Sequence, residues 1–223
     1  MRPEPAIGGT SESWSHRKFR GTHAHNRCVM DAEAVDLVAV SLARADDGVA
    51  IVAVDGHSAA GKSTFATQLA DRIGGSIVQG DDFYRVMEPA ERAGLSPADG
   101  ASRYYDWERM RAEVLLPLRR GQLARFLAYD WGTNNLGRQF RTVGPVPVVV
   151  VEGLFVSRPE LDDVVDMCVL VTAGADVRRR RQIQRGDASD EWLERWDAAE
   201  RWYFEHARPP STFDIVVDTS AAR

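Results

Sequence analysis

The sequence predicts an α/β fold in which a mainly parallel sheet of five strands carries helices on both faces. Short β-branched runs alternate with amphipathic stretches along the chain, and this alternation favours parallel strands joined by helices. Residues 49–55 are apolar up to Asp55, as expected of a strand covered on both sides. The stretch that follows, 63–73, places Phe65, Leu69 and Ile73 on one face of a helix.

The other elements follow in chain order. We expect a helix before the first strand, a mobile excursion rich in Pro, Gly and charge, and a helix that Gly121 ends. The first helix is expected at 31–45, the excursion at 85–102 and the helix before Gly121 at 106–120. The later strands are expected at 76–80, 145–151, 164–171 and 213–217. The last two helices are expected at 176–185 and 190–206. Residues 28–223 then form one domain with a small arginine-bearing lid at about 174–190, after a polar, disordered tail over 1–27.

Composition excludes several classes of protein. The chain has 223 residues and a net charge of −5, which argues against a general nucleic-acid binder. Cys28 and Cys168 are too few for a disulfide framework, so we expect a cytoplasmic protein. No apolar run approaches the roughly 18 residues of a membrane span. We therefore expect neither nucleic-acid nor membrane partners; a homo-oligomer is compatible with the sequence.

A phosphate-binding motif follows the first strand and opens the next helix. The pattern G-x-x-x-x-G-K-[ST] is met by Gly56, His57, Ser58, Ala59, Ala60, Gly61, Lys62, Ser63 and Thr64. Backbone N–H groups of such a loop point at one spot, where the helix dipole also favours negative charge. Lys62 is one of only two lysines in the chain. The motif and its context predict the P-loop NTPase fold and a bound nucleotide.

Acidic residues follow three of the predicted strands: Asp55, the pair Asp81 and Asp82, and Glu152. In such sheets the ligand lies beyond the carboxyl ends of the strands. A carboxylate there can hold Mg²⁺ or accept a proton from an attacking hydroxyl. It can also merely cap the following turn, and for Asp55 both readings stay open.

Arginines are spaced along one face of the predicted lid helix, at Arg178, Arg181 and Arg185. Such a face can close over phosphates and neutralise developing charge, although a charge run on a helix can also be simply solvated. Aromatic residues cluster between the second and fourth predicted strands, among them Tyr84 and Tyr129, and could stack on a planar acceptor such as a base.

The ordered set of motifs resembles the uridine kinase group of P-loop small-molecule kinases, which is related to phosphoribulokinase and pantothenate kinase. The resemblance runs from about residue 49 to 218. It is carried by the loop at 56–64 and by the segments Gln79-Gly-Asp-Asp-Phe-Tyr-Arg85, Tyr105-Asp106, Tyr129-Asp130, Val151-Glu-Gly153, 178–185 and Phe213-Asp-Ile-Val-Val217.

The resemblance implies a role for each matching residue. Asp81 would be the base at the acceptor hydroxyl, and Ser63, Asp81 and Glu152 would surround Mg²⁺. Asp106 would hold sugar hydroxyls, Tyr129 would contact the acceptor's base, and the arginines of 178–185 would form the lid. The chain departs from the group in two places: Asn134 or Asn135 stands where a histidine commonly reads the pyrimidine, and Arg185-Gly186 stands where Arg-Asp is usual.

These observations favour an ATP- and Mg²⁺-dependent kinase that phosphorylates a hydroxyl of a small molecule, with a nucleoside as the leading acceptor. In that reading Lys62, Asp81 and the lid arginines are catalytic, and Tyr84, Asp106, Tyr129 and Asn134 contact the acceptor. The alternatives are a non-nucleoside acceptor, such as pantothenate, a sugar or a sugar phosphate, and a regulatory nucleotide-binding ATPase without an acceptor. A nucleotide-switch GTPase is disfavoured because no lysine follows Lys62 to complete a guanine-reading motif.

Overall fold

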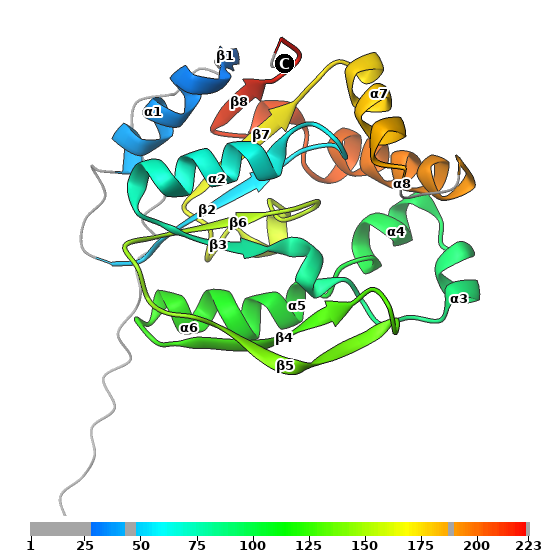
Figure 1. Cartoon of the computed structure of the whole chain (residues 1–223), viewed down its shortest axis with the longest axis horizontal. Helices are drawn as coiled ribbons and strands as arrows, with labels where there is room; N and C mark the ends of the chain where they lie inside the picture. The colour runs from blue at the N-terminus through cyan, green and yellow to red at the C-terminus, as the bar shows by residue number, and fades with distance from the viewer. Residues whose placement is uncertain (1–27, 43–47, 187–189, 222–223) are drawn as a thin grey trace, which may run out of the picture.

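The computed structural model describes residues 28–42, 48–186 and 190–221, so the tail predicted over 1–27 lies outside the described residues. A parallel sheet forms the centre (Figure 1), in the order β1-β8-β7-β2-β6-β3. Its strands are β1 (Cys28–Met30), β2 (Ala50–Asp55), β3 (Ser76–Gln79), β6 (Val148–Glu152), β7 (Met167–Thr172) and β8 (Ile215–Asp218). The predicted strands are all present, and the short β1 adds a sixth at one edge.

Both faces of the sheet are buried, which explains the continuous apolar runs of its strands. Side chains alternate along β2: Ile51 and Ala53 join one core, whereas Val52 and Val54 join the other. Helices α1 (Asp31–Leu42) and α2 (Lys62–Ile73) cover the second of these faces. Phe65 and Leu69 of α2 are fully buried there, as the helical spacing predicts.

The opposite face is covered by the middle of the chain and by a late helix. Helix α5 (Trp107–Met110) continues through a π-helical turn (Arg111–Leu115) into α6 (Leu116–Arg119), which confirms the helix predicted there. The helix α8 (Asp190–Trp202) packs against α4 (Pro97–Arg103). The predicted excursion over 85–102 contains α4 and the short helix α3 (Pro89–Ala93).

A β-hairpin lies outside the central sheet and was not predicted. Strands β4 (Ala124–Asp130) and β5 (Asn135–Val143) pair antiparallel below α5 and α6 in Figure 1. The tip of this hairpin is the polar, glycine-interrupted stretch that contains Trp131 and Asn134. In the described parts of the chain, no helix combines the length and the apolar character needed to span a membrane.

Candidate active site

The phosphate loop connects β2 to α2, as the sequence predicts. Gly56 has φ +146°, and a Cβ there would lie 1.9 Å from the backbone oxygen of Val171 on the neighbouring β7. Only glycine fits at such a position. Gly61 has φ +99° and directly precedes α2, whose first residue is Lys62. The Lys62 Nζ donates to the His57 carbonyl at 3.1 Å, so the ammonium lies across the loop beside the helix N-terminus.

Glu200, on α8, binds the phosphate loop through hydrogen bonds. Its carboxylate is 1% exposed and accepts hydrogen bonds from His57 Nδ1 at 3.0 Å and Ser58 N at 3.1 Å, and another from the Ser58 hydroxyl. Burial raises the pKa of Glu200, but the hydrogen bonds from His57 and Ser58 and the charge of Lys62 outweigh it, and the pKa lies below its ordinary value. The sequence interpretation missed this residue. The available signal was an acidic residue one helical turn after Trp196, beside the apolar face of the helix.

Asp55 has a structural role rather than a chemical one. It is fully buried and accepts hydrogen bonds from Gly56 N at 2.7 Å, Phe155 N at 3.0 Å, Ser157 N at 2.9 Å and Tyr203 Oη at 3.1 Å. These donors occupy the lone-pair positions of both oxygens. The carboxylate therefore fixes the turn after β2 and the segment after β6, which favours the capping reading of this residue.

The end of β6 brings the predicted metal and phosphate residues together. Glu152 pairs with Val54 of β2 and Gln79 of β3 in the sheet, so it lies between the strand that enters the phosphate loop and the strand that precedes Asp81. Burial raises the pKa of Glu152; the Lys62 charge opposes this, the Asp81 charge adds to it, and a hydrogen bond from Ser63 lowers it. All four side chains therefore belong to one cluster.

The oxygens of this cluster suit a magnesium ion. Ser63, Asp81 and Glu152 supply a hydroxyl and two carboxylates, the hard oxygen donors that Mg²⁺ prefers. The charge of Asp81 raises the pKa of Glu152, and a divalent cation between the two carboxylates would relieve that repulsion. The residues present therefore fit the metal.

Asp81 differs from its neighbour Asp82 in surroundings. Asp81 lies in the 3-10 turn Gly80–Phe83 after β3, is exposed, and accepts a hydrogen bond from Tyr105 Oη at 2.9 Å. Asp82 is buried, and both of its oxygens accept hydrogen bonds from Arg141 Nη1, at 2.8 and 2.6 Å. Asp82 therefore fastens the hairpin to the sheet, whereas Asp81 keeps an oxygen open to the site.

The predicted lid arginines lie along α7 (Ala175–Arg185), and their contacts are with the phosphate loop and its surroundings. Arg178 Nη1 is 4.0 Å from Glu200. Arg181 donates to the Ala59 carbonyl at 3.2 Å and to the Thr219 carbonyl at 3.1 Å. Arg185 is close enough to Glu152 to lower its pKa. The helix ends at Gly186, which has φ +68°.

The predicted acceptor residues surround Tyr84. The Tyr84 ring is 2% exposed and lies edge-on to Tyr129 at 5.0 Å and stacked on Trp131 at 4.7 Å. Asn134 already uses its amide: it accepts from Tyr129 Oη at 2.6 Å and donates to the Met87 carbonyl at 3.1 Å. Asp106 caps α5 by accepting from Arg109 N at 3.1 Å. Asn134 and Asp106 therefore have structural contacts, and their binding roles stay predictions.

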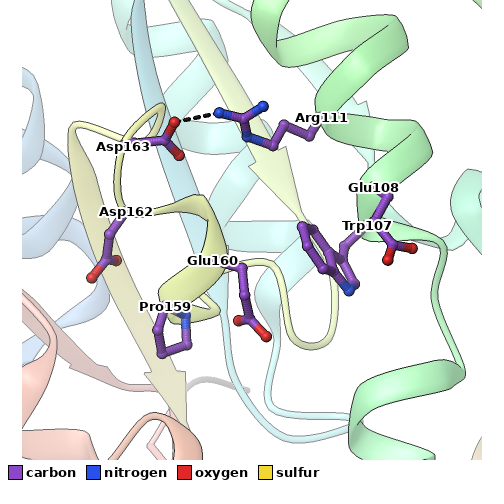
Figure 2. Close-up of a pocket in the computed structure, with 7 residues that line it drawn as sticks. All are labelled: Trp107, Glu108, Arg111, Pro159, Glu160, Asp162 and Asp163. Atoms are coloured by element: carbon purple, nitrogen blue, oxygen red, sulfur yellow. Dashed lines mark hydrogen bonds and ion pairs between the residues drawn. The ribbon is translucent and has the colours of Figure 1, made fainter.

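A surface hollow lies apart from these residues. Figure 2 shows a cavity of about 670 Å³ between the start of α5 and the 3-10 turn Pro159–Leu161. Each of its four carboxylates already meets an arginine: Glu108 with Arg85, Glu160 with Arg158, Asp162 with Arg208, and Asp163 with Arg111. None of the predicted site residues lines it.

Known proteins of one family resemble this chain. The model of the phosphoribulokinase / uridine kinase family matches residues 51–191. A uridine kinase of Halobacterium salinarum is 29% identical over 139 residues, which cover 60% of this chain and 61% of that protein. A uridine kinase of Deinococcus deserti is 29% identical over 164 residues, which cover 71% of this chain and 78% of that protein. The chain thus spans about three fifths of the length of the first relative.

The fold has solved counterparts. The structure of a possible uridine kinase from Bacillus stearothermophilus superimposes with a TM-score of 0.65 at 19% identity, covering 84% of this chain and 98% of that one. A likeness at this identity supports the fold alone. The family itself is shown by the match of the family model over residues 51–191. The chain belongs to the phosphoribulokinase/uridine kinase family and has the fold of a P-loop kinase.

Proposed function

We propose that the protein transfers the γ-phosphoryl group of ATP to a hydroxyl of a small-molecule acceptor in the presence of Mg²⁺. The observation that carries this proposal is the cluster at the end of β6, in which Lys62, Ser63 and Asp81 all act on Glu152. A phosphate-binding lysine, two carboxylates and a hydroxyl at the carboxyl ends of adjacent strands are the parts that phosphoryl transfer needs.

Each group has a distinct task in this reaction. The backbone N–H groups of the loop and the Lys62 ammonium bind the β- and γ-phosphates. Asp81 accepts the proton of the acceptor hydroxyl as its oxygen bonds to the γ-phosphorus, and the bond to the β–γ bridging oxygen breaks to release ADP. Ser63, Asp81 and Glu152 would hold the magnesium ion, which neutralises phosphate charge when bound.

The lid arginines supply further positive charge. Arg181 and Arg185 lie on one face of α7: Arg181 donates to the Ala59 carbonyl of the loop, and the charge of Arg185 lowers the pKa of Glu152. Preorganised cations at this position stabilise the charge that spreads over the transferred group.

The class of acceptor rests on separate support. The two relatives named as uridine kinases favour a nucleoside. In such an acceptor Asp106 would hold sugar hydroxyls and the rings of Tyr84 and Tyr129 would lie beside the base. However, Asn134, which stands at the pyrimidine-reading position, is held by Tyr129 and Met87. This observation favours the alternative of a non-nucleoside acceptor such as pantothenate, a sugar or a sugar phosphate.

The experiment is a coupled assay of ADP release with Mg²⁺ and ATP across nucleosides, pantothenate, sugars and sugar phosphates. We expect acceptor-dependent turnover that Asp81→Asn lowers at least about a hundredfold and Asp82→Asn largely retains. The second variant is a matched control, because Asp82 is the adjacent carboxylate and its oxygens are bound to Arg141. Turnover without any acceptor dependence, or an Asp81→Asn variant as active as the parent, would reject the proposal.

A further inference from the structure

A small, partly open cavity lies between α3, the end of α4 and α8. Its volume is about 130 Å³, enough for a compact chemical group rather than a whole nucleoside. Two arginines and three aromatic side chains dominate its wall, and no carboxylate belongs to it. The lining residues are Pro89, Arg92, Ala93, Tyr104, Trp192, Arg195 and Trp196.

Arg92 brings an uncompensated positive charge to this cavity. One of its terminal nitrogens donates to the Arg85 carbonyl at 2.8 Å and lies 3.4 Å from the Asn134 oxygen. Its Nε is buried and meets no acceptor among the described residues. Arg92 has no ion pair with a carboxylate in the part of the chain that the structure describes, and its guanidinium lies 4.5 Å from the centre of the Tyr84 ring. The buried Nε–H therefore lacks an acceptor, and a guanidinium with such an open donor can take an anion.

Arg195 approaches the same space from α8. Arg195 forms an ion pair with Glu191 at 2.9 Å, and the Arg195 side chain is 32% exposed whereas that of Glu191 is 81% exposed. Such a rim pair contributes little and exchanges readily for another anion. The charges of Arg195 and Arg92 both act on the Tyr104 hydroxyl, so the two cations face one wall of the cavity.

The cavity adjoins the proposed reaction centre. Trp196 lines it, and its ring centroid lies 5.9 Å from that of Tyr105. The Tyr105 hydroxyl in turn donates to Asp81. The stacked rings of Tyr84 and Trp196, 5.8 Å apart, form a second connection. The cavity is therefore on the side of Asp81 where the proposed acceptor residues lie, and one aromatic contact and one hydrogen bond connect it to Asp81.

From these contacts we infer that the cavity binds an anionic group of the acceptor, a carboxylate or a phosphate, through Arg92 and Arg195. The acceptor is then a hydroxy compound with an acidic end rather than a neutral nucleoside. The inference rests on the proposed kinase function for the placement of the acceptor hydroxyl at Asp81. The three aromatic side chains of the wall reduce the contact of this space with water, and a charge-assisted contact between guanidinium and anion is stronger where water is scarce.

The first test is kinetic and compares acceptors in matched pairs, acidic and neutral: D-glycerate with glycerol, and ribose 5-phosphate with ribose. We expect turnover of an acidic member, with at least a tenfold higher KM for that acceptor in Arg92→Gln and in Arg195→Gln. The KM for ATP stays unchanged in both variants. Arg103→Gln is the control, because Arg103 is the last residue of the neighbouring α4, pairs with Glu91 and does not line the cavity. The two pairs separate a carboxylate from a phosphate ligand.

The second test does not depend on turnover. Succinate and inorganic phosphate are each titrated by calorimetry into the protein with ADP at saturation, so that the phosphate loop is filled. Binding that Arg92→Gln and Arg195→Gln weaken at least tenfold, and Arg103→Gln does not, supports the site even if no acceptor is turned over and the proposed function fails. If neither anion binds, the inference is rejected. A neutral nucleoside used best of all and equally well by Arg92→Gln rejects it too, while leaving the kinase proposal intact.

Discussion

Glu200 accepts a hydrogen bond from the backbone N of Ser58 at 3.1 Å, across 142 positions of sequence. This contact joins α8 to the phosphate loop and, together with His57, closes the loop around a buried carboxylate. Because the loop's N–H groups must point at the phosphates before a nucleotide arrives, a fixed loop binds with less loss of conformational freedom.

The first prediction is that Glu200→Ala weakens ATP binding at least tenfold and lowers the free energy of unfolding by roughly 1–3 kcal/mol. The substitution leaves the Ser58 N–H and hydroxyl without their acceptor, which is the costly way to remove a buried hydrogen bond. Calorimetric titration of ATP and urea denaturation provide the measurements. Glu205→Ala, an exposed acid later on the same helical run, is the control; an equal effect of both substitutions would contradict the assigned role.

The second prediction concerns how the stability of the folded protein depends on pH through Glu200. The pKa of Glu200 is lowered in the folded protein from an ordinary value of 4.5. The folded state therefore binds its proton less readily than the unfolded state, so the stabilisation is complete above pH 4.5 and is lost as the pH falls through the folded pKa. Urea denaturation from pH 7 to pH 3 should show the stability gap between the parent and Glu200→Gln shrinking below about pH 4.5. A gap that stays constant over this range counts against the ionised contact.

The third prediction separates chemistry from folding with two aspartates. Asp81→Asn should lower kcat by about 10²–10⁴-fold, the usual contribution of a general base, with little change in melting temperature because Asp81 is exposed. Asp55→Asn should do the reverse and lower the melting temperature, because an amide NH₂ cannot accept the hydrogen bonds that the carboxylate receives. Thermal melts and the ADP-release assay on both variants decide the matter. A stable but inactive Asp55→Asn would show that its role here is misassigned.

The fourth prediction is that Glu152→Gln stabilises the protein without ligands while removing its response to Mg²⁺. The pKa of Glu152 is raised, chiefly by burial. A raised pKa means that the carboxylate costs stability as the pH rises from the ordinary value through the folded one, and this cost is largest at neutral pH. At pH 8 without MgCl₂ the variant should therefore melt at a higher temperature than the parent. Added MgCl₂ should raise the melting temperature of the parent and leave that of the variant unchanged. A variant that melts lower than the parent in EDTA would refute this account.

The fifth prediction tests the close approach at Gly56. Gly56→Ala should lower the free energy of unfolding by at least about 1–3 kcal/mol, as overpacking does, because the new methyl group would overlap the Val171 carbonyl. Gly121→Ala is the control, since Gly121 also has a positive φ, +66°, but no atom lies within 4 Å of the place that its new methyl group would take. Equal losses in urea denaturation would assign the effect to backbone strain alone.

The predictable part of this fold is the part encoded in short stretches of sequence. Apolar runs define β2 and β6, helical spacing defines α2, and the loop motif places Lys62 and Ser63 between them. The hairpin was missed because β5 is mostly exposed and so lacks an alternation of apolar and polar residues. Its strands are stabilised by pairing with each other and by contacts such as that of Arg141 with Asp82.

The candidate site divides in the same way. The strand-end acids and the spacing of the α7 arginines are local features, and the structure brings them to one edge of the sheet. Glu200 was not predicted, because an acidic residue in a charged helix is usually solvated, and its burial results from His57 and Ser58 folding against it. Arg92 was missed for a related reason: whether a guanidinium lacks a counter-charge depends on contacts between distant segments.

The four-residue spacing of Trp196 and Glu200 limits how the specificity of this protein can be redesigned. One turn of α8 presents Trp196 to the rings of Tyr84 and Tyr105 and Glu200 to the phosphate loop. A smaller side chain at Trp196, chosen to admit a bulkier acceptor, would let the helix settle inward and shift Glu200 with it. Acceptor preference is therefore better altered from the excursion and the hairpin, which lie outside α8 and outside its contact with the phosphate loop.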